Sequence, residues 1–267
     1  MRKIKNYKNK VVWITGASSG IGEALAYEIS RLGAFIVLSS RNERKMDEIR
    51  ERCNDPAKHM VLGLDLESSQ SFPDALEKVL GKYATIDILI NCGAVSQKAI
   101  SFRTHDEIER RIMEINYWGT VNLSKCVLKH MMKTRNGMIV VFSSVLGKIG
   151  ISGRSSYSAS KHALHGYFDS LRCDLRKEGY KDIIIKTICP GYIKTKISYN
   201  YLDENGNALN FMDKDHENAM ASDECAKRII RMLQYSGLEY LVGGKEVFAV
   251  HLKRYLQSFF LKNSYRF

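Results

Sequence analysis

Short apolar runs alternate with amphipathic segments along most of the chain. The apolar runs lie at residues 10–15, 35–39, 59–64, 86–90, 138–143 and 183–188. Between them, apolar residues recur at helical spacing at 21–32, 43–53, 68–82, 108–132 and 155–178. Strands that are apolar on both faces and alternate with helices are typical of a parallel sheet covered on both sides. We therefore predict an α/β protein with a doubly wound fold, whose central parallel sheet has about seven strands flanked by helices.

The periodic pattern stops between Tyr192 and Met220, where a polar segment contains Asn205-Gly206. A stretch of this length without periodicity inside a compact domain is usually functional. We predict a lid at 192–220, whose apolar side chains either line a pocket or pack the lid onto the body. These side chains are Tyr192, Ile197, Tyr199, Tyr201, Leu209, Phe211 and Met212. No domain boundary is visible, so residues 1–267 are expected to form a single domain.

Apolar residues form a helical stripe in the C-terminal tail, residues 245–267. The stripe consists of Phe248, Leu252, Tyr255, Leu256, Phe259 and Phe260. Lys253 and Arg254 lie off it, as in an amphipathic helix. One interpretation is an interfacial helix on an anionic membrane, which would make the protein peripheral to that membrane. The other is a stripe that packs on its own body or on a partner subunit. We expect a homodimer or homotetramer.

Composition narrows the class of protein. The chain has 267 residues, of which 45% are hydrophobic and 26% charged, which excludes disordered and low-complexity classes. The net charge of +12 is concentrated in residues 1–10 and 245–267, so a basic nucleic-acid-binding surface is not expected. The six cysteines are far apart and form no Cys/His cluster, so we expect neither a metal site nor a disulfide framework. A cytoplasmic location fits best, and no apolar run is long enough to span a bilayer.

A glycine-rich turn separates the first apolar run from the first amphipathic segment. It reads Thr15-Gly16-Ala17-Ser18-Ser19-Gly20-Ile21-Gly22. Glycines here allow a tight turn and a close approach of backbone N–H groups to a phosphate at a helix N-terminus. The alternative is a plain strand-to-helix turn. We expect a dinucleotide site that includes Gly16, Ser18, Ser19, Gly20, Ile21 and Gly22.

This turn resembles that of the short-chain dehydrogenase/reductases, whose glycines are spaced Thr-Gly-x-x-x-Gly-x-Gly. The resemblance extends over essentially the whole chain. It implies a Rossmann fold, a nicotinamide cofactor, and hydride transfer between that cofactor and a carbonyl/alcohol pair of a small molecule.

The second apolar run ends in Ser39-Ser40-Arg41, without an acidic residue. A free ribose 2′-hydroxyl calls for a carboxylate at this place, whereas a 2′-phosphate calls for a cation. The planar guanidinium of Arg41 suits a phosphate, so NADP(H) is favoured over NAD(H). The alternative is that Arg41 begins the solvated face of the next helix.

Two further positions resemble the adenosine side of the family's cofactor site. Asp65 and Leu66 match its adenine-contacting aspartate and the neighbour of that residue, although Asp65 would also serve as a helix N-cap. Asn91 matches the first residue of the family's Asn-Asn-Ala-Gly, and the three residues after it depart from that pattern. The resemblance therefore gives Asn91 a supporting role near the ribose.

Tyr157 and Lys161 are four residues apart in a predicted helix, which places both side chains on one face. Tyr192 and Lys196 have the same spacing but follow Pro190-Gly191 in an irregular segment. Ser144 stands thirteen residues before Tyr157, at the end of the fifth apolar run. Bringing the pKa of a tyrosine from about 10 to neutrality takes roughly 4 kcal/mol, which an ammonium about 4 Å away supplies at an effective dielectric constant near 20.

The resemblance gives these residues roles. Tyr157 would be the acid/base, Lys161 would lower its pKa and hold the nicotinamide ribose, and Ser144 would hydrogen-bond the substrate oxygen. Asn116 matches the residue that positions a water leading to the lysine, although it could also cap or kink its helix.

Pro190, Gly191, Ile193 and Thr195 lie in a match to the family's Pro-Gly-x-x-x-Thr, where the backbone and the threonine meet the nicotinamide carboxamide. The alternative is an ordinary proline-glycine strand end. His162 and His165 are expected to be packing or interface residues.

Within the family, Ser143–Lys148 and Tyr157–His162 are most similar to reductases related to 11β-hydroxysteroid dehydrogenase, which favours a lipophilic ketone or secondary alcohol. The competing class is a non-catalytic NADP-binding regulatory or scaffold protein of the same fold. A sugar-nucleotide epimerase or dehydratase would call for a larger substrate domain and a different glycine spacing.

Overall fold

The computed structural model describes residues 6–211 and 217–263. The basic residues Arg2, Lys3 and Lys5, the lid residue Met212 and the last part of the tail, 264–267, lie outside these ranges.

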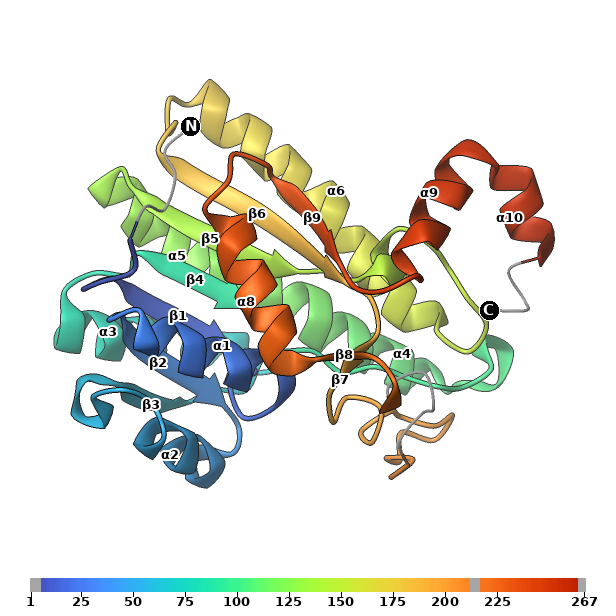
Figure 1. The fold of residues 1–267 in the computed structure, drawn as a ribbon, viewed down its shortest axis with the longest axis horizontal. Coiled ribbons are helices and arrows are strands. Elements are labelled where there is room, and N and C mark those ends of the chain that lie inside the picture. Colours follow the sequence, from blue (N-terminus) through green and yellow to red (C-terminus); the bar gives the residue numbers. More distant parts are fainter. Residues whose placement is uncertain (1–5, 212–216, 264–267) are drawn as a thin grey trace.

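A seven-stranded parallel sheet forms the centre of the molecule, in the order β3-β2-β1-β4-β5-β6-β9 (Figure 1). Its strands are β1 (Val11–Thr15), β2 (Phe35–Ser40), β3 (Met60–Gly63), β4 (Ile88–Asn91), β5 (Gly137–Phe142), β6 (Ile183–Pro190) and β9 (Glu239–Val242). The six strands located in the sequence lie within two residues of their predicted bounds. The α/β fold with a parallel sheet of about seven strands is thereby confirmed.

Helices cover both faces of the sheet because alternate side chains of each strand point to opposite faces. In β1, Val12 and Ile14 enter one apolar core, and Val11 and Trp13 enter the other. The first core contains apolar residues of α1 (Gly20–Arg31), α2 (Glu43–Glu51) and α8 (Ser222–Leu233). The second contains those of α3 (Phe72–Tyr83), α5 (Thr120–Thr134) and α6 (Ser155–Lys177).

The strand order reverses beside β1, which pairs with β2 on one side and with β4 on the other. In doubly wound sheets, ligands bind outside the carboxyl ends of the strands at such a reversal. The glycine-rich turn leaves β1 at this edge, so the fold places it where a ligand site is expected.

The long helix predicted at 108–132 is divided into three parts. Helix α4 spans Asp106–Met113, a π-helical segment, η4, spans Glu114–Gly119, and α5 follows. Single-turn π segments inside helices occur frequently at functional sites. Here the segment contains Asn116, whose side chain pairs with the backbone of Val95. Apolar periodicity continues through such a segment, which is why the sequence pattern predicts one helix.

The predicted lid has short regular elements of its own. Strands β7 (Ile193–Lys194) and β8 (Met220–Ala221) pair in parallel at its two ends. Between them, a turn closes where Asp203 N–H donates to the carbonyl of Asn207, with Gly206 at φ +85°. That positive φ is readily adopted by glycine.

The tail forms two helices instead of one. Helix α9 spans Val247–Tyr255 and α10 spans Gln257–Asn263, with Leu256 outside helical geometry between them. The resulting bend turns Phe260 into a buried position. Within the described residues, no helix combines the length and the apolar character that crossing a membrane requires.

Candidate active site

Two adjoining cavities open at the carboxyl edge of the sheet. The glycine-turn cavity, about 460 Å³, is bordered by the turn after β1 and by the ends of β2 and β3. The apolar cavity, about 540 Å³, is bordered by the ends of β5 and β6, by α6 and by the tail helix α9. Both have Ile21, Cys92 and Thr195 in their walls, so they form one continuous cleft.

The glycine turn leaves room for a ligand's phosphates. Gly16 and Gly20 have φ values of +66° and +59°. A Cβ on Gly22 would lie 2.3 Å from the carbonyl oxygen of Gly16, so a side chain there would break the turn. Helix α1 begins at Gly20, and Ser19 makes no side-chain capping bond. The first N–H groups of α1 are thus available for a phosphate, as a dinucleotide requires.

Three more of the predicted cofactor residues border the glycine-turn cavity: Arg41, Asp65 and Leu66. Arg41 makes no salt bridge with any described residue. The Asp65 carboxylate accepts a hydrogen bond from the backbone N–H of Glu67 at 3.1 Å. Because α3 begins only at Phe72, Asp65 closes a turn and is not a helix N-cap.

Asn91 occupies a different environment. It ends β4, is 3% exposed, and donates from Nδ2 to the hydroxyl of Ser124 at 3.0 Å. Its Oδ1 is buried without a hydrogen-bond partner among the described residues. The neighbouring Cys92 and Gly93 border the cavity instead. This placement suits the supporting role that the resemblance implies and brings no direct contact with the cleft.

Ser144, Tyr157 and Lys161 all border the apolar cavity. Ser144 follows β5, and its hydroxyl donates to the carbonyl of Pro190 at 3.3 Å and accepts from the N–H of Leu146 at 3.1 Å. Burial raises the pKa of Tyr157, and a hydrogen bond with Ser144 and the charge of Arg154 partly oppose that rise.

Lys161 is buried one turn beyond Tyr157 in α6. Its ammonium donates to the carbonyl of Phe142 at 2.7 Å and lies 5.7 Å from the centre of the Tyr157 ring. Burial lowers the pKa of Lys161 to about 8. The separation is larger than the 4 Å on which the electrostatic argument rests, and the net pKa shift of Tyr157 is upward. Lys161 by itself therefore does not bring Tyr157 into the neutral range.

Asn116 connects three parts of the site. Its Oδ1 accepts from the N–H of Val95 at 2.9 Å, and its Nδ2 donates to the carbonyl of Val95 at 2.9 Å and to the Ser160 hydroxyl at 3.1 Å. The π segment is thereby tied both to the loop after β4 and to the helix of Tyr157 and Lys161. The side chain is fully buried, which suits a positioning role.

Pro190, Gly191, Ile193 and Thr195 border the apolar cavity, and Thr195 also borders the glycine-turn cavity. Glu246, which no sequence pattern singles out, stabilises this loop. Its Oε1 accepts from the N–H groups of Tyr192 at 2.9 Å and Gly244 at 2.8 Å. The chain separation of Tyr192 and Glu246 explains why no local motif could reveal this contact.

Arg154 is a second residue that sequence patterns do not reveal. It borders the apolar cavity at the N-terminus of α6 and donates to the carbonyl of Gln97. Its guanidinium lies 3.7 Å from the centre of the Tyr201 ring, which belongs to the lid. Arg154 thus connects the catalytic helix to the lid by a cation–π contact.

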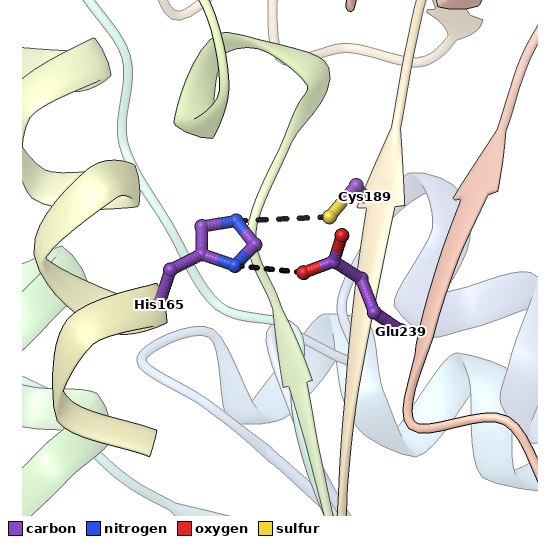
Figure 2. A group of neighbouring side chains, drawn as sticks. All are labelled: His165, Cys189 and Glu239. Carbon is purple, nitrogen blue, oxygen red and sulfur yellow. Dashed lines mark hydrogen bonds and ion pairs between the residues drawn. The ribbon is translucent and has the colours of Figure 1, made fainter. Parts of the chain in front are cut away.

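The ring of His165 in α6 faces Cys189 of β6 and Glu239 of β9, which lie on the same side of it (Figure 2). Its Nε2 is 2.9 Å from the Ser143 hydroxyl and 3.8 Å from Cys189 Sγ, and its Nδ1 is 3.1 Å from Glu239 Oε2. The thiol and the carboxylate therefore face different ring nitrogens, and the three side chains place their ligand atoms within 4.8 Å of one another. Lys148 Nζ also lies 2.7 Å from Glu239. Hydrogen bonds and close polar contacts of this group thus join α6, β6 and β9.

A doubly wound parallel sheet, a glycine turn at the strand-order reversal and a Ser-Tyr-Lys group in the wall of the adjoining cavity define a Rossmann-type nicotinamide-dependent oxidoreductase. A short-chain dehydrogenase family model matches residues 10–206. The chain belongs to this short-chain dehydrogenase/reductase family.

Several curated relatives are similar to this chain in sequence. Human Dehydrogenase/reductase SDR family member 7 is 40% identical over 225 residues, covering 82% of this chain and 66% of the human protein. The Dehydrogenase/reductase SDR family protein 7-like of Drosophila melanogaster is 36% identical over 252 residues, covering 92% of this chain and 76% of the fly protein. The chain thus spans about two thirds to three quarters of the length of these relatives.

Among solved structures, a short-chain dehydrogenase/reductase from Burkholderia phymatum in complex with NAD superimposes with a TM-score of 0.82 at 19% identity, covering 96% of each chain. An alcohol dehydrogenase from the archaeon Thermococcus sibiricus, complexed with 5-hydroxy-NADP, gives a TM-score of 0.75 at 22% identity and covers 89% of this chain and 97% of its own. Both show the same fold.

Proposed function

We propose that this protein is an NADP-dependent oxidoreductase that interconverts a lipophilic ketone and the corresponding secondary alcohol. The observation that carries the proposal is the position of Ser144, Tyr157 and Lys161 in the wall of an apolar cavity continuous with the glycine-turn cavity. A substrate in the first cavity would lie beside a dinucleotide in the second.

The chain's residues divide the work of the reduction. When bound, the nicotinamide supplies the hydride, or accepts it in the reverse direction. Tyr157 gives its hydroxyl proton to the substrate oxygen as that oxygen gains negative charge. Ser144 donates a hydrogen bond to the same oxygen, and the ammonium of Lys161 adds positive charge beside Tyr157. Asn116 holds the π segment to the loop after β4 and to α6.

Arg41 supports a preference for NADP(H). It borders the glycine-turn cavity at the end of β2, where the strand brings Ser39 and Ser40 and no carboxylate. A guanidinium that forms no salt bridge with any residue of 6–211 and 217–263 suits a 2′-phosphate at this edge. Solved neighbours with NADP and with NAD both occur, so the proposed preference for NADP(H) is argued from Arg41.

The walls of the apolar cavity support a lipophilic substrate. Leu146, Ile149, Ile151, Ile197 and Leu252 contribute aliphatic surface to it. The resemblance of Ser143–Lys148 and Tyr157–His162 to reductases related to 11β-hydroxysteroid dehydrogenase supports the same substrate class. Among the lid residues, Tyr192 and Tyr201 border the cavity, whereas Tyr199 and Phe211 are exposed.

We also infer a cytoplasmic protein that forms a homodimer or homotetramer. All six cysteines are free thiols, which suits a reducing compartment. Trp118, 46% exposed on the π segment, supports a subunit contact. Size-exclusion chromatography with light scattering measures the molar mass of the protein in solution. A monomer at micromolar concentration would contradict the inferred homodimer or homotetramer.

A screen of NADPH oxidation with ketosteroids, quinones and aliphatic ketones tests the proposed reaction. We expect turnover with at least one of them, and a fall of about 10²- to 10⁴-fold in kcat for Tyr157→Phe, because the proton donor is removed while the ring is kept. Tyr235→Phe, at an exposed tyrosine, is the matched control.

The competing scaffold function predicts the opposite pattern. NADPH would bind, no substrate would be turned over, and Tyr157→Phe would change nothing. Unchanged turnover in Tyr157→Phe would also defeat the proposed mechanism.

A further inference from the structure

Helices α9 and α10 form a bent pair that stands out from the body beside the carboxyl end of β9 (Figure 1). The pair carries large apolar side chains that remain exposed. They are Phe248 at 69%, Tyr255 at 75%, Leu256 at 54%, Phe259 at 59% and Leu261 at 56%. Together with Lys253, Arg254 and Lys262, these residues are called the tail surface below.

The tail surface is attached to the body without being packed into it. Helix α9 has no buried residue, and Phe260 is the buried residue of α10. The ammonium of Lys253 donates to the carbonyl of Lys148 at 2.8 Å, which fixes α9 to the loop after β5. Several large apolar side chains exposed on one short pair of helices are unusual on a protein surface in contact with water and point to an interaction site.

The charge of the tail surface has one sign. Residues 247–263 contain Lys253, Arg254 and Lys262 and no aspartate or glutamate. Arg254 and Lys262 are exposed. Apolar and aromatic side chains combined with cations and no acids are the composition of a helix that lies in the interface of an anionic membrane.

The tail surface is continuous with the mouth of the apolar cavity. Phe248, Ala249 and Leu252 of α9 border that cavity, and Phe248 is also one of the exposed residues. If α9 is held against an apolar surface, a lipophilic molecule that leaves this surface would therefore reach the cavity without crossing the polar surface of the protein.

We propose that the tail surface docks on an anionic lipid bilayer and brings the mouth of the apolar cavity to the membrane. A second copy of the chain fits this surface less well. In a two-fold contact the same patch occurs on both subunits, so cations would face cations with no acid to pair them. The docking itself does not depend on the proposed function, whereas the delivery of a lipophilic substrate rests on it.

Co-sedimentation of the full chain with vesicles tests the docking in the absence of cofactor and substrate. Vesicles of phosphatidylcholine with about 30% phosphatidylserine are compared with phosphatidylcholine alone. We expect binding to the anionic vesicles. Phe259→Ser combined with Leu261→Ser should weaken it about 100-fold or more, because two inserted side chains are lost. Arg254→Gln combined with Lys262→Gln should weaken it about 30-fold.

Tyr235→Ser is the matched control, since Tyr235 is 61% exposed and precedes β9, at the opposite end of the sheet from α9. All these side chains are exposed, so the variants should melt at the temperature of the unaltered protein. Absence of vesicle binding by the unaltered chain overturns the proposal. So does a dimer in solution that Phe259→Ser and Leu261→Ser dissociate while vesicles remain unbound, which would make the tail surface a subunit contact. Failure of the oxidoreductase screen would leave the vesicle result unaffected.

Discussion

At the scale of single residues, the proposed reaction depends most on whether the Tyr157 hydroxyl carries its proton. Burial raises its pKa, and the neighbouring Ser144 hydroxyl and Arg154 charge only partly compensate. Lys161, whose own pKa is lowered to about 8, loses part of its charge in the mildly alkaline range. A Tyr157 that keeps its proton suits the reduction direction, in which the tyrosine must donate that proton.

Arg41→Ala should weaken NADP(H) binding far more than NAD(H) binding, by about tenfold or more in Kd, because a charge-assisted contact with the 2′-phosphate is lost. Titration of the intrinsic fluorescence with each cofactor measures the two Kd values. Arg44→Ala, whose side chain is 92% exposed on α2, should change neither. Equal losses for both cofactors in Arg41→Ala would mean that Arg41 does not read the phosphate.

At the scale of elements, β9 supports the site through contacts with the elements that carry the candidate catalytic residues. It pairs with β6 and carries Glu239, whose carboxylate meets His165 of α6 and Lys148 of the loop after β5. The sequence predicts that His165 is a packing or interface residue. In the structure it also makes polar contacts within this network. The hydrogen bond from His165 and then that from Lys148 lower the pKa of Glu239 to about 2.

This network predicts a pH dependence of stability. Because the pKa of Glu239 is lower in the folded protein than the usual value near 4.5, its stabilisation is complete above about pH 4.5 and is lost as the pH falls toward 2. Glu239→Gln should therefore lower the free energy of unfolding at pH 7 by about 1 to 2 kcal/mol, a figure reduced for solvent screening of a partly exposed side chain. The deficit should shrink as the pH is lowered through this range.

Urea unfolding at a series of pH values measures the effect. Glu224→Gln serves as control, because Glu224 pairs with Arg228 on the exposed surface of α8 and such pairs contribute about 0.5 kcal/mol or less. A difference between Glu239→Gln and the unaltered protein that stays constant from pH 7 to pH 3 would contradict the assignment.

At the scale of the whole molecule, the cleft is assembled from segments that are distant in the sequence. The turn after β1 forms one end, α6 and the lid form the middle, and α9 closes the other end. Because α9 borders the apolar cavity, and none of its described residues borders the glycine-turn cavity, we expect the tail to affect the substrate more than the dinucleotide.

Leu252→Ala should accordingly raise KM for a lipophilic ketone identified in the screen by about 5- to 10-fold, since apolar contact surface is removed from the cavity wall. The Kd for NADP(H) should remain unchanged. Steady-state kinetics and cofactor titration on the same preparation check both expectations. Leu32→Ala, at an exposed leucine after α1, controls for the loss of apolar surface elsewhere. An equal change in both constants would show that α9 supports the entire cleft.

The sequence by itself determined the elements and the chemistry that depend on neighbours along the chain. Strands that are buried on both faces are visible in the sequence as apolar runs. A turn that needs positive φ at two positions is visible as the glycines Gly16 and Gly20. The spacing of Tyr157 and Lys161 works in the same way, because a helix converts a four-residue interval into a shared face.

Only the tertiary structure decided the contacts between distant segments. Glu246 reaches Tyr192, Glu239 reaches His165, and Arg154 reaches Tyr201, and none of these pairs shares a periodic pattern. The upward pKa shift of Tyr157 likewise depends on burial by surrounding elements, which outweighs the opposing hydrogen bond with Ser144 and the charge of Arg154. The physical reason is common to all of these features: local geometry follows from residue order, whereas desolvation and long-range pairing exist only once the chain has closed around them.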